Sequence, residues 1–179
     1  MDIEQAIARV IDREGGFSDH PDDRGGATRW GITEAVARAA GFSGPMRSLP
    51  RSEAVAIYRS LYWQQPGLDR IATRAPALAE ELFDTGINLG VKASIGFLQR
   101  ALNALNRGAS DYADIAADGA IGAKTLAALD RFLARRGRGG EGVLVKAVEA
   151  LQGERYLAIT ERRPANEAFL YGWLANRIG

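Results

Sequence analysis

The chain has 179 residues, a length typical of one domain or of one domain with a small appendage. It has no cysteine and a single histidine, His20, which excludes a disulfide scaffold, a cysteine zinc site and a centre built from several histidines. The net charge of +1 gives no general attraction to nucleic acid, and no apolar run approaches the roughly 18 residues of a membrane span. We therefore expect a globular protein with no nucleic-acid partner and no membrane-spanning segment.

The first predicted element is an amphipathic helix that Asp2 caps and that Gly15-Gly16 ends. Its apolar residues recur at helical spacing and form one stripe: Ile3, Ile7, Val10 and Ile11. The segment 17–33 is polar and rich in glycine, which predicts a loop with a small β-hairpin, the kind of region that often carries function. Thr33 is then positioned to cap a helix over 34–40.

The rest of the chain is predicted to be helical. A helix begins at Pro50 and runs to about Trp63, where Pro66-Gly67 breaks the pattern. The helix over 76–89 is apolar on more than one face, which places it in the middle of the molecule. Further helices are predicted over 93–106, 123–135, 141–162 and 165–177, with a basic, flexible turn at 135–140. The fold class is all-α with one small β element.

Glu14 is the most informative single residue. On a helical wheel it falls on the same side as Ile3, Ile7 and Val10, so a carboxyl group stands on the apolar stripe at the C-terminal end of the helix. Apolar surroundings and the negative end of the helix dipole both penalise the ionised form, which is the environment that a general acid requires. The alternatives are a partly exposed glutamate at a frayed helix end and a carboxylate neutralised by a nearby arginine.

Asp23 and Thr28 lie in the polar segment that follows Glu14. A helix end followed by a hairpin is able to bring all three side chains to one cleft. Glycoside hydrolysis requires two carboxyl groups across a cleft, one to protonate the leaving oxygen and one to stabilise the developing cation or activate water. Thr28 is then a candidate for holding that water. The alternative is that the aspartates and glycines only make turns, as such clusters usually do.

Four further residues are candidates for substrate binding. Asp84 and Asn88 are one helical turn apart and share a face, where they either line a cleft or satisfy nearby backbone groups as a buried polar pair. Trp30 and Tyr62 are able to stack on sugar rings, although aromatic residues at helical spacing more often belong to a core. Trp30 is the stronger candidate because it stands in the loop beside the glycines.

Glu14, Asp23, Thr28 and Trp30 lie in a motif that resembles the signature of the glycoside hydrolase family 108 muramidases, lysozyme-like proteins of phage endolysins and secretion-associated loci. The resemblance implies that Glu14 is the catalytic acid, and the order Glu14, Asp23, Thr28 is similar to the catalytic triplet of phage-type lysozymes, with a spacing from Asp23 to Thr28 one residue shorter. The motif reads Glu14-Gly15-Gly16-Phe17, then Asp22-Asp23-Arg24-Gly25-Gly26-Ala27-Thr28-Arg29-Trp30-Gly31-Ile32-Thr33.

The resemblance covers nearly the whole chain. The pattern Leu98-Gln99 followed by Asp118-Gly119-Ala120-Ile121-Gly122-Ala123-Lys124-Thr125 looks like the predicted peptidoglycan-binding half of such proteins. The family therefore implies a lysozyme-like catalytic region over 1–91 and a helical peptidoglycan-binding-like region over 92–179, packed as one compact unit. It also implies hydrolysis of the β-1,4 bond between N-acetylmuramic acid and N-acetylglucosamine, with peptidoglycan strands as the partner. We expect a monomer and no metal or organic cofactor.

The start of the chain, Met1-Asp2-Ile3-Glu4-Gln5, lacks the basic and apolar regions of a secretory signal peptide. We expect synthesis in the cytoplasm and access to periplasmic or cell-wall peptidoglycan through a holin-type lesion or a dedicated export route. Three alternatives remain open from the sequence: a lytic transglycosylase, which needs only one acid, an enzyme of chitinase-type specificity, and a wall-binding accessory protein without turnover.

Overall fold

The computed structural model describes residues 3–14, 16–18 and 27–179, and for Arg13 and Glu14 it describes the backbone alone. The chain divides into two compact units, Met1–Gln65 and Pro66–Gly179, each described here by itself. Both are built mainly from helices, and the only sheet among the described residues is a small one in the first unit. The prediction of an all-α, lysozyme-like fold with a small β element near 17–33 is confirmed.

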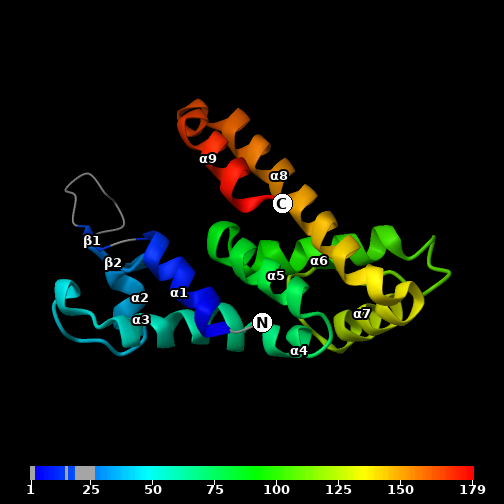
Figure 1. Ribbon diagram of the computed structural model, residues 1–179, viewed down its shortest axis with the longest axis horizontal. Coiled ribbons are helices and arrows are strands. Elements are labelled where there is room, and N and C mark those ends of the chain that lie inside the picture. Colours follow the sequence, from blue (N-terminus) through cyan, green and yellow to red (C-terminus); the bar gives the residue numbers. More distant parts are fainter. Residues whose placement is uncertain (1–2, 15, 19–26) are drawn as a thin grey trace. The chain divides into compact units, whose positions relative to one another are not determined.

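The first unit begins with helix α1 (Ile3–Glu14), which matches the predicted helix up to Gly15-Gly16; the predicted cap Asp2 lies outside the described residues. Three short strands, a helix and a 3₁₀ turn follow: β1 (Phe17–Ser18), β2 (Thr28–Arg29), β3 (Ile32–Thr33), α2 (Glu34–Ala39) and η1 (Met46–Ser48). The unit ends with α3 (Arg51–Tyr58), which continues without a break into the π-helical turn η2 (Arg59–Gln64). Figure 1 labels α1, β1, β2, α2 and α3.

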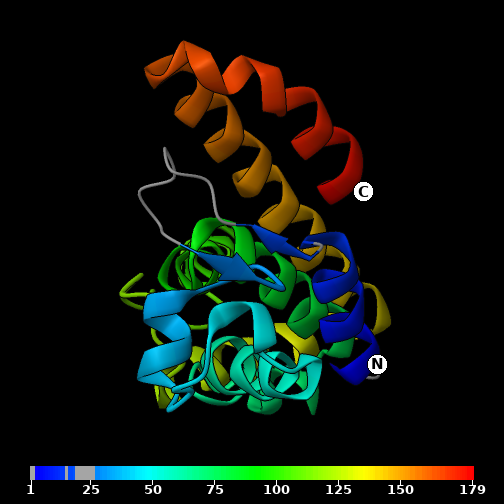
Figure 2. The same ribbon diagram turned by 90° about the vertical axis from the view of Figure 1, so that its left-hand side faces the viewer.

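The sheet is antiparallel, with strand order β1-β2-β3. Ser18 pairs with Thr28, and Thr28 pairs in turn with Thr33. The hydroxyl of Thr33 accepts a hydrogen bond from the backbone N–H of Val36 at 3.4 Å, so Thr33 caps α2 as predicted. The strands therefore lead directly into α2, beside which they lie in Figure 2.

The core of the first unit forms where α1 packs on α3. Three stripe residues of α1, Ile7, Val10 and Ile11, are buried, and Ile7 and Ile11 have no exposed surface. Ile57 and Tyr58 of α3 are buried as well. At the surface, the guanidinium of Arg51 on α3 donates to Asp12 on α1 at 3.1 Å. Burial of the apolar stripe is the larger stabilising term, because an exposed ion pair contributes at most about 1 kcal/mol.

The second unit is a helical assembly arranged around α5 (Pro76–Leu89). Helices α4, α6 and α8 all pack against α5, and Leu78, Leu82 and Phe83 of α5 are almost completely buried. The prediction of a helix that is apolar on more than one face and lies at a core is confirmed. The other helices of this unit are α4 (Leu68–Ala72), α6 (Val91–Leu105), α7 (Ala123–Arg136), α8 (Gly140–Arg162) and α9 (Glu167–Arg177).

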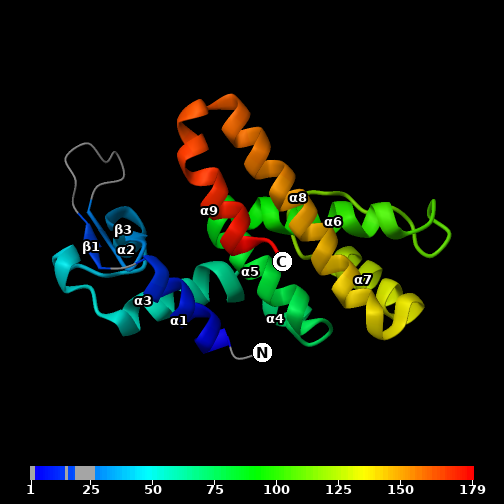
Figure 3. The ribbon, with the colours of Figure 1, turned by 45° about the horizontal axis from the view of Figure 1, so that its top comes forward.

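The last two helices form an antiparallel pair, which Figure 3 shows as α9 running back along α8. Tyr156 of α8 is buried, and its ring lies 5.3 Å from the ring of Trp173 on α9. A short 3₁₀ turn, η4 (Pro164–Asn166), reverses the chain between them. In the part of the chain that the structure describes, no helix combines the length and the apolar character needed to span a bilayer.

Three local features differ from the sequence predictions. Helix α4 follows Pro66-Gly67 directly, where only a break was predicted, and its five residues are too short for a periodic pattern to reveal. The end of the predicted helix 50–63 is a π-helical turn. The basic turn 135–140 is largely ordered: α7 extends to Arg136, the 3₁₀ turn η3 (Gly137–Gly139) follows, and α8 begins at Gly140.

The connection from α6 to α7 is held by a hydrogen-bond cluster centred on the buried side chain of Gln99. The side-chain Nε2 of Gln99 donates to Asp118 at 2.8 Å, to the carbonyl of Ala120 at 3.0 Å and to the hydroxyl of Thr125 at 3.1 Å. Its Oε1 accepts from the backbone N–H of Gly119 at 2.8 Å. The hydrogen bond from Gln99 lowers the pKa of Asp118, and that from the Ala120 N–H adds to it. Through these hydrogen bonds, Gln99 of the Leu98-Gln99…Thr125 pattern holds α6, the connection and the start of α7 together.

Gly119 is required by geometry within that cluster. Its φ is 77°, in the left-handed region, and a Cβ at this position would lie 2.6 Å from the carbonyl oxygen of Lys92. We expect Gly119→Ala to lower the free energy of unfolding of the chain by roughly 1–3 kcal/mol, because the substitution adds both backbone strain and a steric clash. Urea denaturation followed by circular dichroism measures this loss.

Gly122→Ala is the matched control for that substitution. Gly122 has an extended backbone, and a Cβ there would meet no atom within 4 Å. We expect the free energy of unfolding of this variant to stay within about 0.5 kcal/mol of wild type or to rise slightly. Equal stability of the two variants would show that Gly119 is not constrained in the way described.

Candidate active site

The position of Glu14 follows from the burial of α1. Ile7, Val10 and Ile11 are buried, and Glu14 stands seven, four and three residues after them, so its position is on the same side of the helix. It is also the last residue of α1, at the negative end of the helix dipole. The side chain of Glu14 and the whole of Asp23 lie outside the described residues.

Thr28 is held in the central strand of the sheet. Strand β1 begins three residues after Glu14, and Thr28 pairs with Ser18 at its end. The side chain of Thr28 is half-buried. Thr28 is therefore fixed, by strand pairing on both sides, next to the strand that leads directly out of the C-terminal end of α1.

Trp30 lies at the turn between β2 and β3. Both Trp30 (φ 56°) and Gly31 (φ 74°) adopt left-handed backbone conformations, as the tight two-residue turn of a β-hairpin requires. A bulky residue rarely adopts this conformation, so the turn needs support from its surroundings. The indole N–H donates to the carbonyl of Leu49 at 3.0 Å, and the carbonyl of Trp30 accepts from the Tyr58 hydroxyl at 3.1 Å. Trp30 thus anchors the hairpin, and its proposed contact with substrate stays a prediction.

Tyr62 lies in the π-helical turn η2. Its ring is 5.6 Å from that of Tyr58, and burial raises the pKa of its hydroxyl. Because Tyr58 also bonds to Trp30, contacts within the first unit connect Tyr62 to the hairpin that carries Thr28. Insertions of a π turn into α-helices are frequent at functional sites, which makes this segment noteworthy.

Asp84 and Asn88 lie in the second unit, on α5, and share a partner. Arg177 of α9 donates to both carboxylate oxygens of Asp84, at 3.3 and 3.2 Å. With its amide oxygen turned toward α9, Asn88 accepts from Nε of Arg177 at 2.9 Å. The guanidinium is largely buried, with 12% of the Arg177 side chain exposed. The two residues therefore fasten the C-terminal helix to α5, and sugar binding by them stays a prediction.

Glu81 is a titratable residue that the sequence reasoning missed. Burial raises its pKa to about 7, and the charges of Glu149, Asp84 and Glu80 act in the same direction. The hydroxyl of Thr85 lies 3.0 Å from Glu81 and 3.1 Å from the side-chain oxygen of Gln152. A glutamate within a helix that is apolar on more than one face was the available sequence signal. Among the residues described, no group of three or more His, Cys, Asp or Glu side chains is arranged to hold a metal ion.

The raised pKa of Glu81 predicts a pH dependence of stability. The folded state binds this proton more tightly than the unfolded state, whose pKa is near 4.5, so the free energy of unfolding falls as the pH rises from about 4.5 to 7. We expect Glu81→Gln to remove much of this fall, because glutamine does not titrate. Urea unfolding of both proteins at pH 4.5, 6 and 7.5 measures the effect.

Glu154→Gln, an exposed position on α8, serves as the matched control. This variant should keep the pH dependence of wild type. The account of Glu81 is wrong if Glu81→Gln and Glu154→Gln show the same dependence as the wild-type protein.

Residues 7–90 match the model of the family described as glycosyl hydrolase 108, and residues 93–178 match the family described as predicted peptidoglycan domain. A structure titled as that of Brucella abortus SagA is 26% identical, with a TM-score of 0.67 over 97% of this chain and 87% of that chain. The curated proteins contain no match.

The two family matches account for nearly the whole chain and confirm the resemblance inferred from the Glu14–Thr33 motif. A glycosyl hydrolase region joined to a peptidoglycan domain makes the protein a peptidoglycan hydrolase. Residues 7–90 therefore belong to the glycosyl hydrolase 108 family, and residues 93–178 belong to the predicted peptidoglycan domain family.

Proposed function

We propose that the protein is an N-acetylmuramidase that hydrolyses the β-1,4 bond between N-acetylmuramic acid and N-acetylglucosamine, with Glu14 as the general acid. The observation that carries the proposal is that Glu14 continues the buried stripe of α1 as its final residue. An apolar setting and the helix dipole together favour the protonated carboxyl group, which is the form that donates to the glycosidic oxygen.

The remaining steps are assigned to Asp23 and Thr28. Asp23 stabilises the oxocarbenium-like transition state or acts as the base toward water. Thr28 positions that water through its hydroxyl. The half-buried side chain of Thr28 and its place in the central strand support this role, because a water-positioning group must itself be held rigidly. No metal ion enters this scheme.

The biological setting follows from the substrate. The protein acts on periplasmic or cell-wall peptidoglycan, as a phage endolysin that lyses the wall or as a secretion-associated muramidase. It is made in the cytoplasm and reaches the wall through a holin-type lesion or a dedicated export route. We propose that it works as a monomer.

The test is the release of reducing ends from purified Gram-negative sacculi by wild type and by Glu14→Gln. Glutamine keeps the size and polarity of the side chain but has no acidic proton to donate. We expect the variant to lose activity by more than about a hundredfold while it keeps the circular dichroism spectrum of wild type.

Glu53→Gln is the matched control, because Glu53 is an exposed glutamate in the first turn of α3. This variant should retain wild-type activity. Full activity of Glu14→Gln would contradict the proposed role of Glu14. A wild-type protein that binds sacculi but releases no reducing ends from them would contradict the enzymatic proposal and favour a binding accessory.

A further inference from the structure

A groove of about 300 Å³ lies in the second unit, and neither Asp84 nor Asn88 lines it. One wall is helix α7, and the other is the segment 112–115 of the connection from α6 to α7. None of the residues assigned to catalysis or sugar binding lines it. It lies wholly within the region that matches the predicted peptidoglycan domain.

The α7 wall has a regular chemical pattern. Lys124, Ala127, Ala128 and Arg131 line the groove, at the spacing that places residues on one side of a helix. The two alanines leave the middle of this wall shallow, and a cation stands at each end. Seven residues of helix separate the cations, a rise of about 10 Å. Both cations are exposed, and neither forms a hydrogen bond or ion pair within the described part of the chain.

The opposite wall is fixed to α6 by side-chain hydrogen bonds. Asn103 of α6 both accepts from the N–H of Ile115 at 2.9 Å and donates to its carbonyl at 2.8 Å. Asn106 donates to the carbonyl of Tyr112 at 3.2 Å and to the carboxylate of Asp114 at 2.6 Å. The hydroxyl of Tyr112 donates to the carbonyl of Leu102 at 2.8 Å. This wall is therefore held before any ligand arrives.

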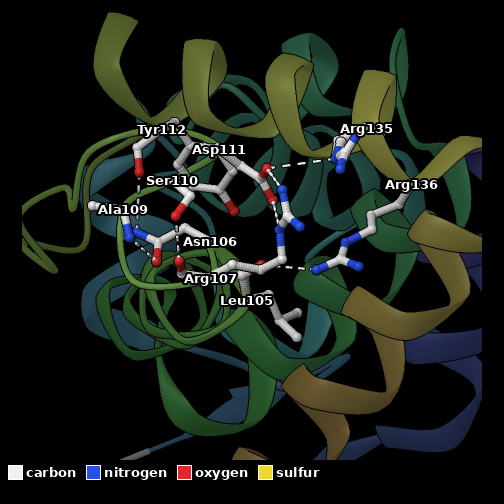
Figure 4. Close-up of polar contacts among 9 residues, drawn as sticks. All are labelled: Leu105, Asn106, Arg107, Ala109, Ser110, Asp111, Tyr112, Arg135 and Arg136. Carbon is white, nitrogen blue, oxygen red and sulfur yellow. Dashed lines mark hydrogen bonds and ion pairs between the residues drawn. The ribbon is translucent and has the colours of Figure 1, made fainter.

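The chain reaches this wall through a strained turn, which Figure 4 shows. Arg107 and Ala109 have left-handed φ values of 57° and 63°, which cost energy in residues that are not glycine. Asn106 holds the turn by accepting from the N–H of Ala109 at 3.0 Å, and Arg107 pairs with Asp111. The hydrogen bond from Arg107 also lowers the pKa of Asp111. A rigid wall of this kind reduces the entropy that is lost on binding.

The charges and the shape of the groove together indicate the chemistry of its ligand. Two unpaired cations at the ends of a shallow groove complement an extended molecule with carboxylates at both ends. Ala127 and Ala128 leave space for methyl-sized side chains between them, and the carboxylate of Asp114 on the facing wall complements an amine. Short peptides rich in alanine, with several free carboxylates and one free amine, have this composition.

We propose that this groove binds the peptide stem of peptidoglycan, with stem carboxylates at Lys124 and Arg131 and an alanine methyl group over Ala127. The inference rests on the proposed function, because that function supplies a substrate that carries such stems. It assigns to the second unit a subsite that holds the wall by its peptide, separately from the sugar chain that the first unit cleaves.

The first test is direct binding, with the full chain and the synthetic tripeptide N-acetyl-L-Ala-γ-D-Glu-meso-diaminopimelic acid as the probe, in which the acetyl group leaves one free amine. We expect isothermal titration calorimetry to detect binding by wild type and at least a tenfold weaker affinity for the double variant Lys124→Glu/Arg131→Glu. The control is Lys146→Glu/Arg155→Glu, which makes the same change of net charge at exposed positions on α8. Absence of binding by wild type, or equal weakening in both double variants, would overturn the proposal.

A second variant tests the shape of the groove without any change of charge. Ala127 is exposed, so Ala127→Trp should fold normally and fill the middle of the groove. We expect this variant also to lose binding of the tripeptide by at least tenfold, with an unchanged circular dichroism spectrum. Unchanged affinity in the tryptophan variant would place the peptide elsewhere and contradict the proposal.

A third measurement separates this inference from the proposed function. Intact sacculi are compared with glycan strands from which an amidase has removed the stems. The Lys124→Glu/Arg131→Glu variant should show a raised KM on intact sacculi and unchanged cleavage of the stripped strands. If wild type cleaves neither substrate but binds the tripeptide, the proposed function is wrong and the groove proposal is supported. If wild type cleaves both but binds no tripeptide, the groove proposal fails alone.

Discussion

Helix α1 buries Ile7 and Ile11 completely, and this burial fixes the rotation of the helix about its own axis. Once that rotation is fixed, the position of Glu14 on the buried side follows from the helical repeat alone. The end of the helix at Glu14 then determines where β1 begins, and strand pairing determines where Thr28 stands. The backbone positions of Glu14 and Thr28 thus depend on apolar packing between α1 and α3.

Much of the fold could be predicted from the sequence because helices leave strong local signals. The apolar repeat of α1, the Thr33 cap of α2 and the apolar character of α5 each identified an element correctly. The π-helical turn η2 was missed because it uses residues that also suit an α-helix. The ordered turn that contains η3 was missed because glycine and arginine suggest flexibility, whereas its conformation depends on the helices at either side.

The candidate site was less predictable, because partners distant in the sequence decide what a side chain does. Trp30 supports its hairpin through Leu49 and Tyr58, and Asp84 pairs with Arg177 from the last helix. Neither partner follows from a local pattern. Glu81 was overlooked for a similar reason, since its raised pKa comes from packing within the second unit. Glu14 was identified because both the wheel and the family motif point to it, and its catalytic role stays a prediction.

We propose that the protein adds water across the bond after N-acetylmuramic acid. Mass spectrometry of borohydride-reduced digests of sacculi is the decisive measurement, because the reduced sugar reports both the bond cleaved and the fate of water. Fragments that end in N-acetylmuraminitol are expected. Fragments that end in 1,6-anhydro-N-acetylmuramic acid would instead show a lytic transglycosylase, and fragments that end in N-acetylglucosaminitol would show cleavage of the other bond. Either of these two results would show that the protein is not an N-acetylmuramidase.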